Sequence, residues 1–253
     1  MNSNLFIKTI SLERDKIDNF DIYPFNIDVV KNLSVIKLNK PVTFLIGENG
    51  IGKSTFIEAL AVSIGLNPEG GSQNFNFSTK NTHSNLFEYL RIGRFNKPKT
   101  KFFLRTESFY NVETEIVNIS EFQGLGRPIY ESYGGNLHEC SHGEAFIKLV
   151  KNRFSDHGLY ILDEPEAALS PQRQMTLLCL IHNLVLEGSQ FIIATHSPIL
   201  ISYINGEILD LNDNFNVIKY EDTEIYQTYK MYLSDPYRMQ KLLFDSKEWM
   251  FML

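Results

Sequence analysis

The chain has little of several residue types, and each scarcity argues against a class of protein. Its 253 residues include two cysteines, too few for a disulfide framework, so we expect a reducing cytoplasm. Lysine and arginine number 24 against 30 acidic residues, a formal charge of −6. That balance does not support direct DNA binding, although a local basic patch is compatible with a negative total. No apolar run approaches the roughly 20 residues of a membrane-spanning helix, so we expect no membrane insertion.

Short apolar runs and helical periodicities alternate along the chain, which predicts an α/β fold. The length suits one domain over residues 1–253, and we find no internal repeat or low-complexity tract. Almost continuous apolar runs, such as 158–162, are typical of a parallel sheet covered on both faces. The predicted strands are 5–12, 33–38, 41–46, 101–109, 158–162 and 190–194, with antiparallel pieces near 207–209 and 216–220. The predicted helices are 53–64, 141–154, 171–187, 222–233 and 235–245.

A glycine-rich segment between the strand at 41–46 and the following helix matches the phosphate-binding pattern G-x-x-x-x-G-K-[ST]. The pattern spans Gly47 to Ser54, and the alternative is a chance glycine turn. Backbone N–H groups and the positive end of a helix would surround phosphates there. Lys53 is expected to reach the β- and γ-phosphates, and Ser54 to bind Mg²⁺. The predicted nucleotide-binding residues of this loop are Glu48, Asn49, Gly50, Ile51, Gly52, Lys53, Ser54 and Thr55.

Two carboxylates follow the apolar strand at 158–162, at the end where α/β sheets place ligands. Asp163 is a candidate Mg²⁺ ligand opposite Ser54, and Glu164 is a candidate to orient and polarise an attacking water. An Asp-Glu pair after a strand is, by itself, usually a solvated turn. The phosphate loop upstream favours the catalytic interpretation.

These motifs together resemble an ATP-binding-cassette (ABC) ATPase, and the resemblance covers nearly the whole chain. Residues Pro165–Pro171 are similar to the D-loop of that family, which crosses a dimer interface. His196, in Ala194–Pro198, is similar to the switch histidine, which would contact the γ-phosphate; a lone histidine after a strand is otherwise more often structural. The resemblance implies a P-loop NTPase of ABC-ATPase type, with a mainly parallel core sheet flanked by helices. It also implies an N-terminal antiparallel β portion, a short helical lobe at about 110–157 and a C-terminal helical tail at about 221–253.

The signature motif of that family, LSGGQ, is degenerate in this chain. Ser141 and Gly143 retain the serine and one glycine, Cys140 replaces the leucine, and Glu144 stands for the glutamine. A serine hydroxyl, a glycine N–H and a helix N-terminus remain suited to a γ-phosphate. The charge of Glu144 is unfavourable near phosphate, although the residue also lies where a capping-box glutamate would.

Two further family features are poorly marked in the sequence. The glutamine that links metal and water to the second lobe has its nearest counterpart at Glu107, a candidate metal ligand, with Gln123 as a later alternative. Adenine stacking needs an aromatic or an arginine before the phosphate loop. Tyr23, Phe25 and Arg14 are candidates, and each can equally be a core or surface residue.

Two observations indicate a branch of the family. The interval between Glu107 and Ser141 is too short for a transporter's helical lobe or for inserted coiled coils. The segment Thr195–Pro198 resembles that of the RecF-like, SMC-like and overcoming-lysogenization-defect ATPases. The chain is thus similar to the small stand-alone AAA/ABC ATPases of bacteria. This resemblance implies an enzyme that uses ATP and Mg²⁺, dimerises head to tail around ATP, and drives or regulates a protein effector partner in DNA repair or phage defence. The alternatives are an energising subunit of an ABC membrane transporter and a regulatory module whose output is nucleotide state. The tail after Tyr220 either docks a partner or packs on the chain's own surface.

Overall fold

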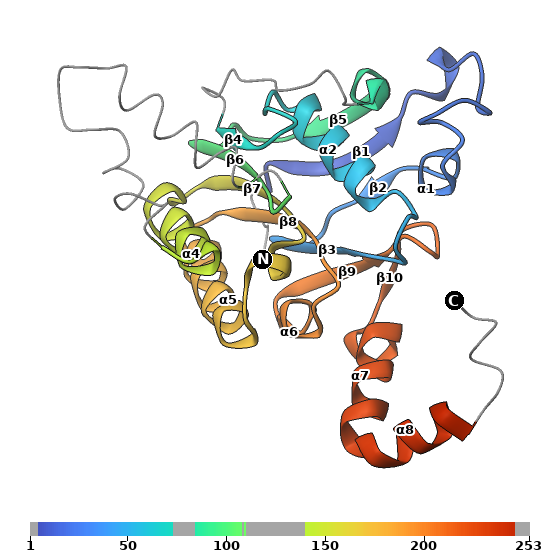
Figure 1. The fold of residues 1–253 in the computed structure, drawn as a ribbon. Coiled ribbons are helices and arrows are strands. Elements are labelled where there is room, and N and C mark those ends of the chain that lie inside the picture. The colour runs from blue at the N-terminus through green and yellow to red at the C-terminus, as the bar shows by residue number, and fades with distance from the viewer. Residues whose placement is uncertain (1–4, 73–83, 108, 110–139, 246–253) are drawn as a thin grey trace.

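The described part of the chain forms two β-sheets of unequal size with helices packed against them (Figure 1). The computed structural model describes residues 5–72, 84–107, 109 and 140–245. Its strands are β1 (Ile7–Leu12), β2 (Ile36–Lys37), β3 (Val42–Ile46), β4 (Gly71–Ser72), β5 (Leu90–Arg94), β6 (Thr100–Arg105), β7 (Gly158–Asp163), β8 (Gln190–Ala194), β9 (Gly206–Asp210) and β10 (Asn216–Ile218). Within these residues the larger sheet has the order β10-β9-β3-β8-β7-β6-β4, and the smaller has the order β2-β1-β5.

The centre of the larger sheet is parallel. Strands β9, β3, β8, β7 and β6 run in one direction, and β10 and β4 add antiparallel edges. Every residue of β3, β7 and β8 is buried, as strands covered on both faces require. In this register Ala194 pairs with both Leu45 and Asp163, so the carboxyl ends of the three strands meet at one edge. The predicted fold class is confirmed, with its mainly parallel sheet and antiparallel N-terminal sheet.

Helices cover both faces of the larger sheet. Helix α2 lies between the two sheets, and α4 and α5 cover the opposite face (Figure 1). The α-helices are α1 (Asp28–Lys31), α2 (Lys53–Ser63), α4 (His142–Arg153), α5 (Pro171–Leu186), α6 (Pro198–Ile201), α7 (Glu224–Ser234) and α8 (Pro236–Asp245). Short 3₁₀ helices occur at Arg14–Lys16, Asn85–Tyr89, Pro165–Ala168 and Tyr220–Asp222. Helices α7 and α8 extend away from the sheets at the end of the described chain.

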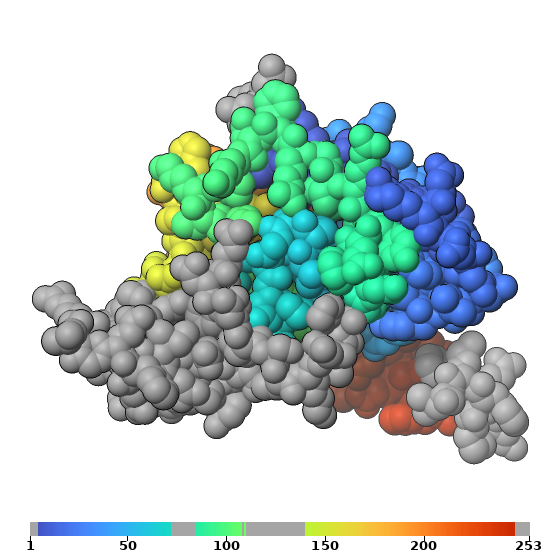
Figure 2. Space-filling model, turned by 90° about the horizontal axis from the view of Figure 1, so that it is seen from above, coloured from blue at the N-terminus to red at the C-terminus, as the bar shows by residue number. Residues whose placement is uncertain are grey.

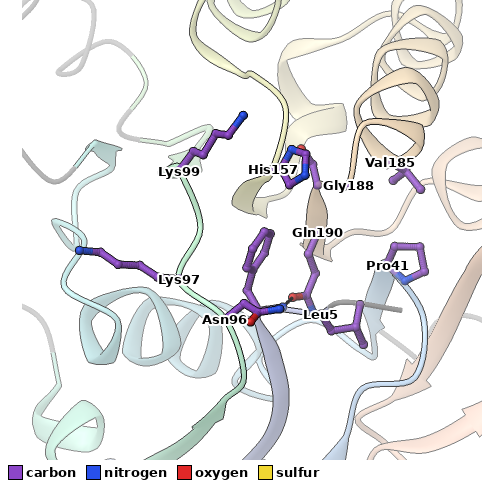
Figure 3. A pocket seen from close by; sticks show the side chains of 11 residues that line it. Leu5, Pro41, Asn96, Lys97, Lys99, His157, Val185, Gly188 and Gln190 are labelled. Atoms are coloured by element: carbon purple, nitrogen blue, oxygen red, sulfur yellow. Dashed lines mark hydrogen bonds between the residues drawn. The ribbon is translucent and has the colours of Figure 1, made fainter. Parts of the chain in front are cut away.

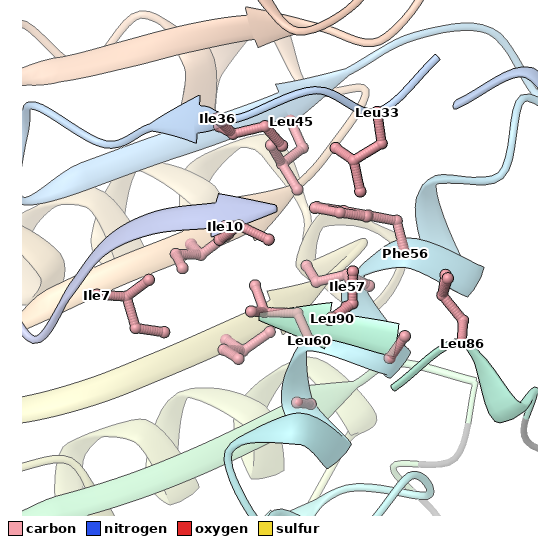
Figure 4. Packing of buried hydrophobic residues seen from close by; sticks show 14 of the residues in the cluster. Ile7, Ile10, Leu33, Ile36, Leu45, Phe56, Ile57, Leu60, Leu86 and Leu90 are labelled. Atoms are coloured by element: carbon pink, nitrogen blue, oxygen red, sulfur yellow. The ribbon is translucent and has the colours of Figure 1, made fainter. Parts of the chain in front are cut away.

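The first hydrophobic core fills the space between the two sheets, around α2 (Figure 4). Phe56, Ile57 and Leu60 of this helix are completely buried. They pack with Ile10 of the small sheet and Leu45 of the large sheet. Full burial of such a side chain stabilises the fold by about 1.5–3 kcal/mol. This packing fixes the helix that begins at the phosphate loop.

Two buried polar side chains join segments that are distant in sequence. The Gln190 amide oxygen accepts hydrogen bonds from the Phe6 and Ile7 N–H groups at 2.8 and 3.0 Å, and its NH₂ donates to the Ile7 carbonyl at 2.9 Å. The Glu207 carboxylate accepts from the Asn39 N–H at 2.7 Å and the Thr43 hydroxyl at 3.1 Å. Buried polar groups need such partners, so Gln190 fixes the small sheet against the first residue of β8.

Several predicted elements differ from those in the structure. The strand expected at 33–38 is reduced to β2, and the strand expected at 101–109 ends at Arg105. Strand β5 was not predicted; it exists because it pairs with β1 in the small sheet. The helices expected at 141–154, 171–187, 222–233 and 235–245 are confirmed within one or two residues. Residues 110–139 of the expected helical lobe and the last residues of the expected tail lie outside the described residues, and the single domain over 1–253 stays a prediction.

Candidate functional site

The glycine-rich loop connects β3 to α2 and has backbone conformations that only glycine adopts easily. Gly50 and Gly52 have φ angles of +83° and +106°. Gly52 is the residue before the first turn of α2, and a Cβ atom there would lie 2.7 Å from the Ile27 side chain. A left-handed backbone is strained for residues other than glycine, and at Gly52 the Ile27 side chain also fills the space that a Cβ atom would need. The loop can therefore wrap backbone N–H groups around an anion at the helix N-terminus.

Lys53 is buried within this loop, with 4% of its surface exposed. Its ammonium group donates to the Gly47 carbonyl at 2.9 Å and to the Glu48 carbonyl at 2.8 Å. Burial lowers the pKa of Lys53, and the charges of Glu164 and Asp163 oppose that shift. An ammonium group has three donors, so one remains for a ligand.

Ser54 and Asp163 come together from α2 and the end of β7. The Ser54 hydroxyl lies 3.5 Å from Asp163 Oδ1, and Asp163 is 3% exposed. Burial raises the pKa of Asp163 to about 7, against the effect of Arg105, whose Nε lies 3.5 Å from Oδ2. A hydroxyl and a carboxylate are oxygen ligands of the kind Mg²⁺ takes, and it fills its remaining positions with water and substrate phosphates. In the described part of the chain, no three His, Cys, Asp or Glu side chains gather as an all-protein metal site.

Glu164 and His196 face each other at the same edge of the sheet. The Glu164 carboxylate lies 3.8 Å from His196 Nε2. Glu164 has a left-handed backbone, with φ 48° and ψ 52°, a conformation that costs a non-glycine residue about 1–2 kcal/mol. Such outliers cluster at active sites. His196 Nε2 is buried and has no hydrogen-bond partner among the described residues. Burial, and then the charge of Lys53, lowers the pKa of His196, so its imidazole is neutral at pH 7.

The D-loop-like segment holds the histidine loop through a carboxylate whose role was not predicted. The Glu166 side chain accepts a hydrogen bond from the His196 N–H. Burial raises the pKa of Glu166, and this hydrogen bond opposes the shift. Arg105 was also missed, although it pairs with Asp163 across neighbouring parallel strands. It forms an ion pair with Glu58 at 2.7 Å.

The degenerate signature forms the start of α4. Ser141 is the N-cap residue of that helix, and Glu144 completes a capping box by accepting from the Ser141 N–H at 3.1 Å. Arg173, at the start of α5, donates to the Ser141 hydroxyl at 3.2 Å and to Glu144 at 3.0 Å. A Cβ atom on Gly143 would lie 2.7 Å from both the Ala168 carbonyl and the Arg173 guanidinium. The capping role of Glu144 is confirmed, and Arg173, a partner that was not predicted, balances its charge.

The structure separates the signature from the phosphate loop within one chain. In the residues described, no hydrogen bond of Ser141 or Glu144 reaches residues 47–55; the recorded bonds go to α4 and α5. The other predicted residues of the site lie together at the carboxyl edge of the large sheet: Lys53, Ser54, Asp163, Glu164 and His196. Among the described residues the predicted site residues therefore form two groups, and no hydrogen bond joins one group to the other.

The remaining candidates differ in their surroundings. Glu107 is 79% exposed and forms an ion pair with Arg105 at 3.1 Å, so its metal role stays a prediction. Phe25 is 3% exposed and packs edge-on against Tyr89, so it is a core residue and is not available to adenine. Tyr23 is 62% exposed, and the Arg14 guanidinium donates to the Lys31 carbonyl. Gln123 lies outside the described residues.

A hollow of about 350 Å³ adjoins the phosphate loop. Gly47, Asn49 and His196 line one part of it, and Glu224 and Tyr229 of α7 line another. The sequence carried no signal for this contact, because it depends on where β9 and β10 place the C-terminal helices. Helix α7 therefore borders the candidate nucleotide site.

Comparisons with known proteins agree with this architecture. A family model described as an AAA domain matches residues 16–155, and one described as an AAA ATPase domain matches residues 141–201. The lipoprotein-releasing system ATP-binding protein LolD of Buchnera aphidicola is 28% identical over 243 residues, covering 87% of this chain and 99% of that protein. An uncharacterized ABC transporter ATP-binding protein of Haemophilus influenzae is 25% identical over 193 residues, covering 68% of this chain and 70% of that protein.

Among solved structures, cbiO1 of Clostridium perfringens, part of the ABC transporter complex cbiONQ, is 18% identical with a TM-score of 0.48, over 94% of this chain and 99% of that one. The SMC head domain of Thermotoga maritima is 17% identical with a TM-score of 0.41, over 81% of this chain and 95% of that one. The AAA domain model covers more than half of the chain and includes the phosphate loop, and the second model includes Asp163, Glu164 and His196. The chain belongs to the AAA domain family, and its phosphate loop lies within the residues that this family model matches.

Proposed function

We propose that this chain hydrolyses ATP with Mg²⁺ in a head-to-tail dimer that encloses two nucleotides. The observation that carries the proposal is the separation of the two half-sites. Lys53, Asp163 and Glu164 lie at the carboxyl edge of the large sheet, while Ser141 and its helix N-terminus contact α5 instead. A second copy, facing the first, would supply the missing half to each nucleotide.

The residues at the sheet edge have suitable chemistry for phosphoryl transfer to water. The ammonium group of Lys53 would neutralise charge on the β- and γ-phosphates, and Ser54 and Asp163 would hold Mg²⁺, which supplies further charge stabilisation. The fit rests on a buried carboxylate beside a hydroxyl, as described above. Glu164 would accept a proton from the attacking water while the bond between the γ-phosphorus and the ADP oxygen breaks. His196 Nε2, which lacks a partner in the described residues, would contact the γ-phosphate.

The partner copy would contribute the start of its α4. The Ser141 hydroxyl, the Gly143 N–H and the helix dipole would face the γ-phosphate of the first copy, where negative charge develops. Glu144 can lie near that phosphate because Arg173 compensates its charge. ATP would then join the two copies, and hydrolysis would release them.

Glu164→Gln tests the composite site directly. This variant keeps the side-chain shape and loses the base, so we expect an ATP-stabilised dimer with strongly reduced turnover. Multi-angle light scattering after gel filtration, with ATP and Mg²⁺, measures the oligomeric state. Glu164→Gln combined with Lys53→Ala is the matched control, and it should stay monomeric because Lys53 is needed for nucleotide binding. A Glu164→Gln protein that remains monomeric at saturating ATP would contradict the proposal.

For the biological role, we favour a cytoplasmic ATPase that drives or regulates a protein effector in DNA repair or phage defence. The support is the resemblance of Thr195–Pro198 to the RecF-like, SMC-like and overcoming-lysogenization-defect ATPases, together with the short interval between Glu107 and Ser141. Affinity capture with Glu164→Gln and ATP is the appropriate test, because that variant should hold the partner-bound state. A soluble effector retained only with ATP is the expected result.

The second candidate function is the nucleotide-binding subunit of an ABC membrane transporter. It is favoured by the names of the two relatives, an ABC transporter ATP-binding protein and LolD of a lipoprotein-releasing system. Among the described residues, none of the helices is both long and apolar enough to cross a membrane. Capture of an integral membrane protein from detergent extracts by the same variant would establish this candidate and exclude the first.

A further inference from the structure

Positive charge is concentrated in one short segment of this acidic chain. Between residues 91 and 101 the sequence has arginine or lysine at five positions and no carboxylate, whereas the whole chain has a formal charge of −6. The segment covers β5, the connection to β6 and the first residues of β6. Figure 2 shows these green residues exposed beside the cyan α2. The five residues are Arg91, Arg94, Lys97, Lys99 and Lys101.

Two adjoining hollows lie along this segment, with volumes of about 540 and 670 Å³. Both are lined by Asn96, Lys97 and Lys99. The first extends to His157 and Gly188, on the far side of the connection, as Figure 3 shows. The second extends to Arg94, Lys101 and Ile64. We call the combined surface the basic pocket; its cations are Arg94, Lys97, Lys99 and Lys101, and His157 borders it.

In the part of the chain that the structure describes, few carboxylates neutralise the cations of the basic pocket, and its other recorded partners are neutral: Arg94 donates to the Ser63 carbonyl and Lys101 to the Ile64 carbonyl. The pKa of Lys101 is lowered by burial and further by the positive charges of Arg94 and Lys97, which is the effect of like charges placed together. Asp156 is the one carboxylate found paired with the basic pocket in the described residues, with both Lys99 and His157. Lys97 forms no hydrogen bond or ion pair with the residues that the structure describes. An anion bound here would relieve this repulsion.

An exposed aromatic ring lies beside the cations. Phe95 directly follows the last residue of β5 and is 65% exposed. The Lys8 ammonium lies 3.9 Å from the centre of its ring. Cations that follow a backbone, next to an aromatic side chain on which a base can stack, are the recurring elements of single-strand nucleic-acid sites.

The basic pocket is distinct from the candidate nucleotide site. Strands β6, β7 and β8 begin at the basic pocket, with Thr100, Gly158 and Gln190, and end at the nucleotide edge. Six residues of extended strand span about 20 Å. The residues that would bind ATP are therefore at the opposite edge of the same sheet.

We propose that the basic pocket binds single-stranded nucleic acid through its phosphate backbone, with Phe95 stacking on a base. An acidic protein segment would satisfy the lysines, but it would leave the exposed ring without a planar partner. The negative total charge of the chain is compatible with this site, because phosphates would interact mainly with nearby cations and those of the basic pocket lie within a few residues of one another in the sequence. The proposal does not depend on the dimer or on hydrolysis.

Fluorescence anisotropy of the full chain with a labelled oligothymidylate of about 20 nucleotides, without ATP, tests the proposal. We expect measurable affinity at about 50 mM salt that falls steeply by about 200 mM. Lys97→Ala should weaken binding several-fold and reduce the magnitude of the log–log salt slope by about 0.7, one phosphate contact of a single strand. Phe95→Ala should weaken binding and leave the slope unchanged, because it removes stacking and no charge.

Lys241→Ala is the matched control, since it removes one exposed lysine from α8 and should bind as the wild type does. Thermal melting checks that each variant is folded. Absence of binding at low salt, or equal affinity for wild type and Lys97→Ala, would overturn the proposal. Binding of polyglutamate in place of the oligonucleotide, with loss in Lys97→Ala, would also overturn it and assign the surface to an acidic protein partner. The binding assay contains no ATP, so its outcomes are independent of those for Glu164→Gln.

Discussion

The guanidinium group of Arg173 lies 3.0 Å from the carboxylate of Glu144, and the same group donates to the Ser141 hydroxyl. The first turn of α4 therefore presents a hydroxyl, backbone N–H groups and a cation, with its one carboxylate already paired. Hydrogen bonds from Ser141, and then the charge of Arg173, lower the pKa of Glu144, so the pair is ionised at neutral pH. A negative residue in the signature position is thus compatible with a phosphate ligand.

Arg173→Ala should lower kcat for ATP hydrolysis about ten-fold, equivalent to about 1.4 kcal/mol, because Glu144 would then meet the γ-phosphate without compensation. ATP affinity of the separate chain should be unchanged, since Lys53 and the phosphate loop are intact. Steady-state kinetics and equilibrium binding of a fluorescent ATP analogue separate the two quantities. Adding Glu144→Gln to Arg173→Ala should restore part of the rate. A double variant that is slower than the single one would show that Arg173 acts otherwise.

The raised pKa of Asp163 predicts how stability depends on pH without nucleotide. In the unfolded chain this carboxyl titrates near its ordinary 3.8, whereas in the folded chain it titrates at about 7. Its contribution to the free energy of unfolding is therefore greatest below pH 3.8 and is lost as pH rises towards 7. Asp163→Asn abolishes the titration and should stabilise the nucleotide-free protein at pH 8, by at most about 4 kcal/mol.

The measurement is the difference in unfolding free energy between Asp163→Asn and wild type, obtained by urea titration at several pH values. Other groups titrate in both proteins and cancel in this difference. The difference should grow between pH 4 and 7 and then level off. A constant difference over that range would mean that burial does not shift this carboxyl.

Glu166→Ala should reduce kcat about ten-fold with little change in ATP affinity. The substitution removes the acceptor that holds the His196 N–H, so the imidazole would no longer be fixed beside Glu164. Glu166 is a positioning residue in this view, since it touches the histidine loop and not the reacting atoms. Glu166→Gln, which keeps an acceptor oxygen, should retain most of the rate. Equal losses in both variants would instead indicate a requirement for the negative charge.

Much of the fold was predictable because buried strands have continuous apolar sequences. Strand β8 has the predicted bounds, Gln190–Ala194, and β7 was predicted to within one residue. Strand β5 was missed because its sequence, with Arg91, Gly93 and Arg94, lacks both the apolar run and regular alternation. Its conformation depends on pairing with β1, which lies far away in the sequence.

In the candidate site too, residues within one motif were easier to predict than contacts between distant segments. Residues within a local motif, such as Lys53 and Asp163, were identifiable because the chemistry and the spacing are contained in a few consecutive positions. Contacts between motifs were not, because they depend on how distant segments pack. The pairing of Arg173 with Glu144 and the hydrogen bond from the His196 N–H to Glu166 are two such contacts. The hollow shared by the phosphate loop and α7 is another.

The position of β8 has a consequence for the two ligands. Gln190, its first residue, lines the basic pocket and joins the small sheet, and His196 follows its last residue by two positions. The strand is hydrogen-bonded on both sides, to β3 and β7. By thermodynamic reciprocity, any factor by which ATP changes the affinity for nucleic acid must equal the factor by which nucleic acid changes the affinity for ATP. Titrating each ligand with the other present, in Glu164→Gln to prevent turnover, gives both factors. If the two factors differ from one, the five residues of β8 would be the shortest stretch of chain that joins the proposed nucleic-acid site to the proposed ATP site.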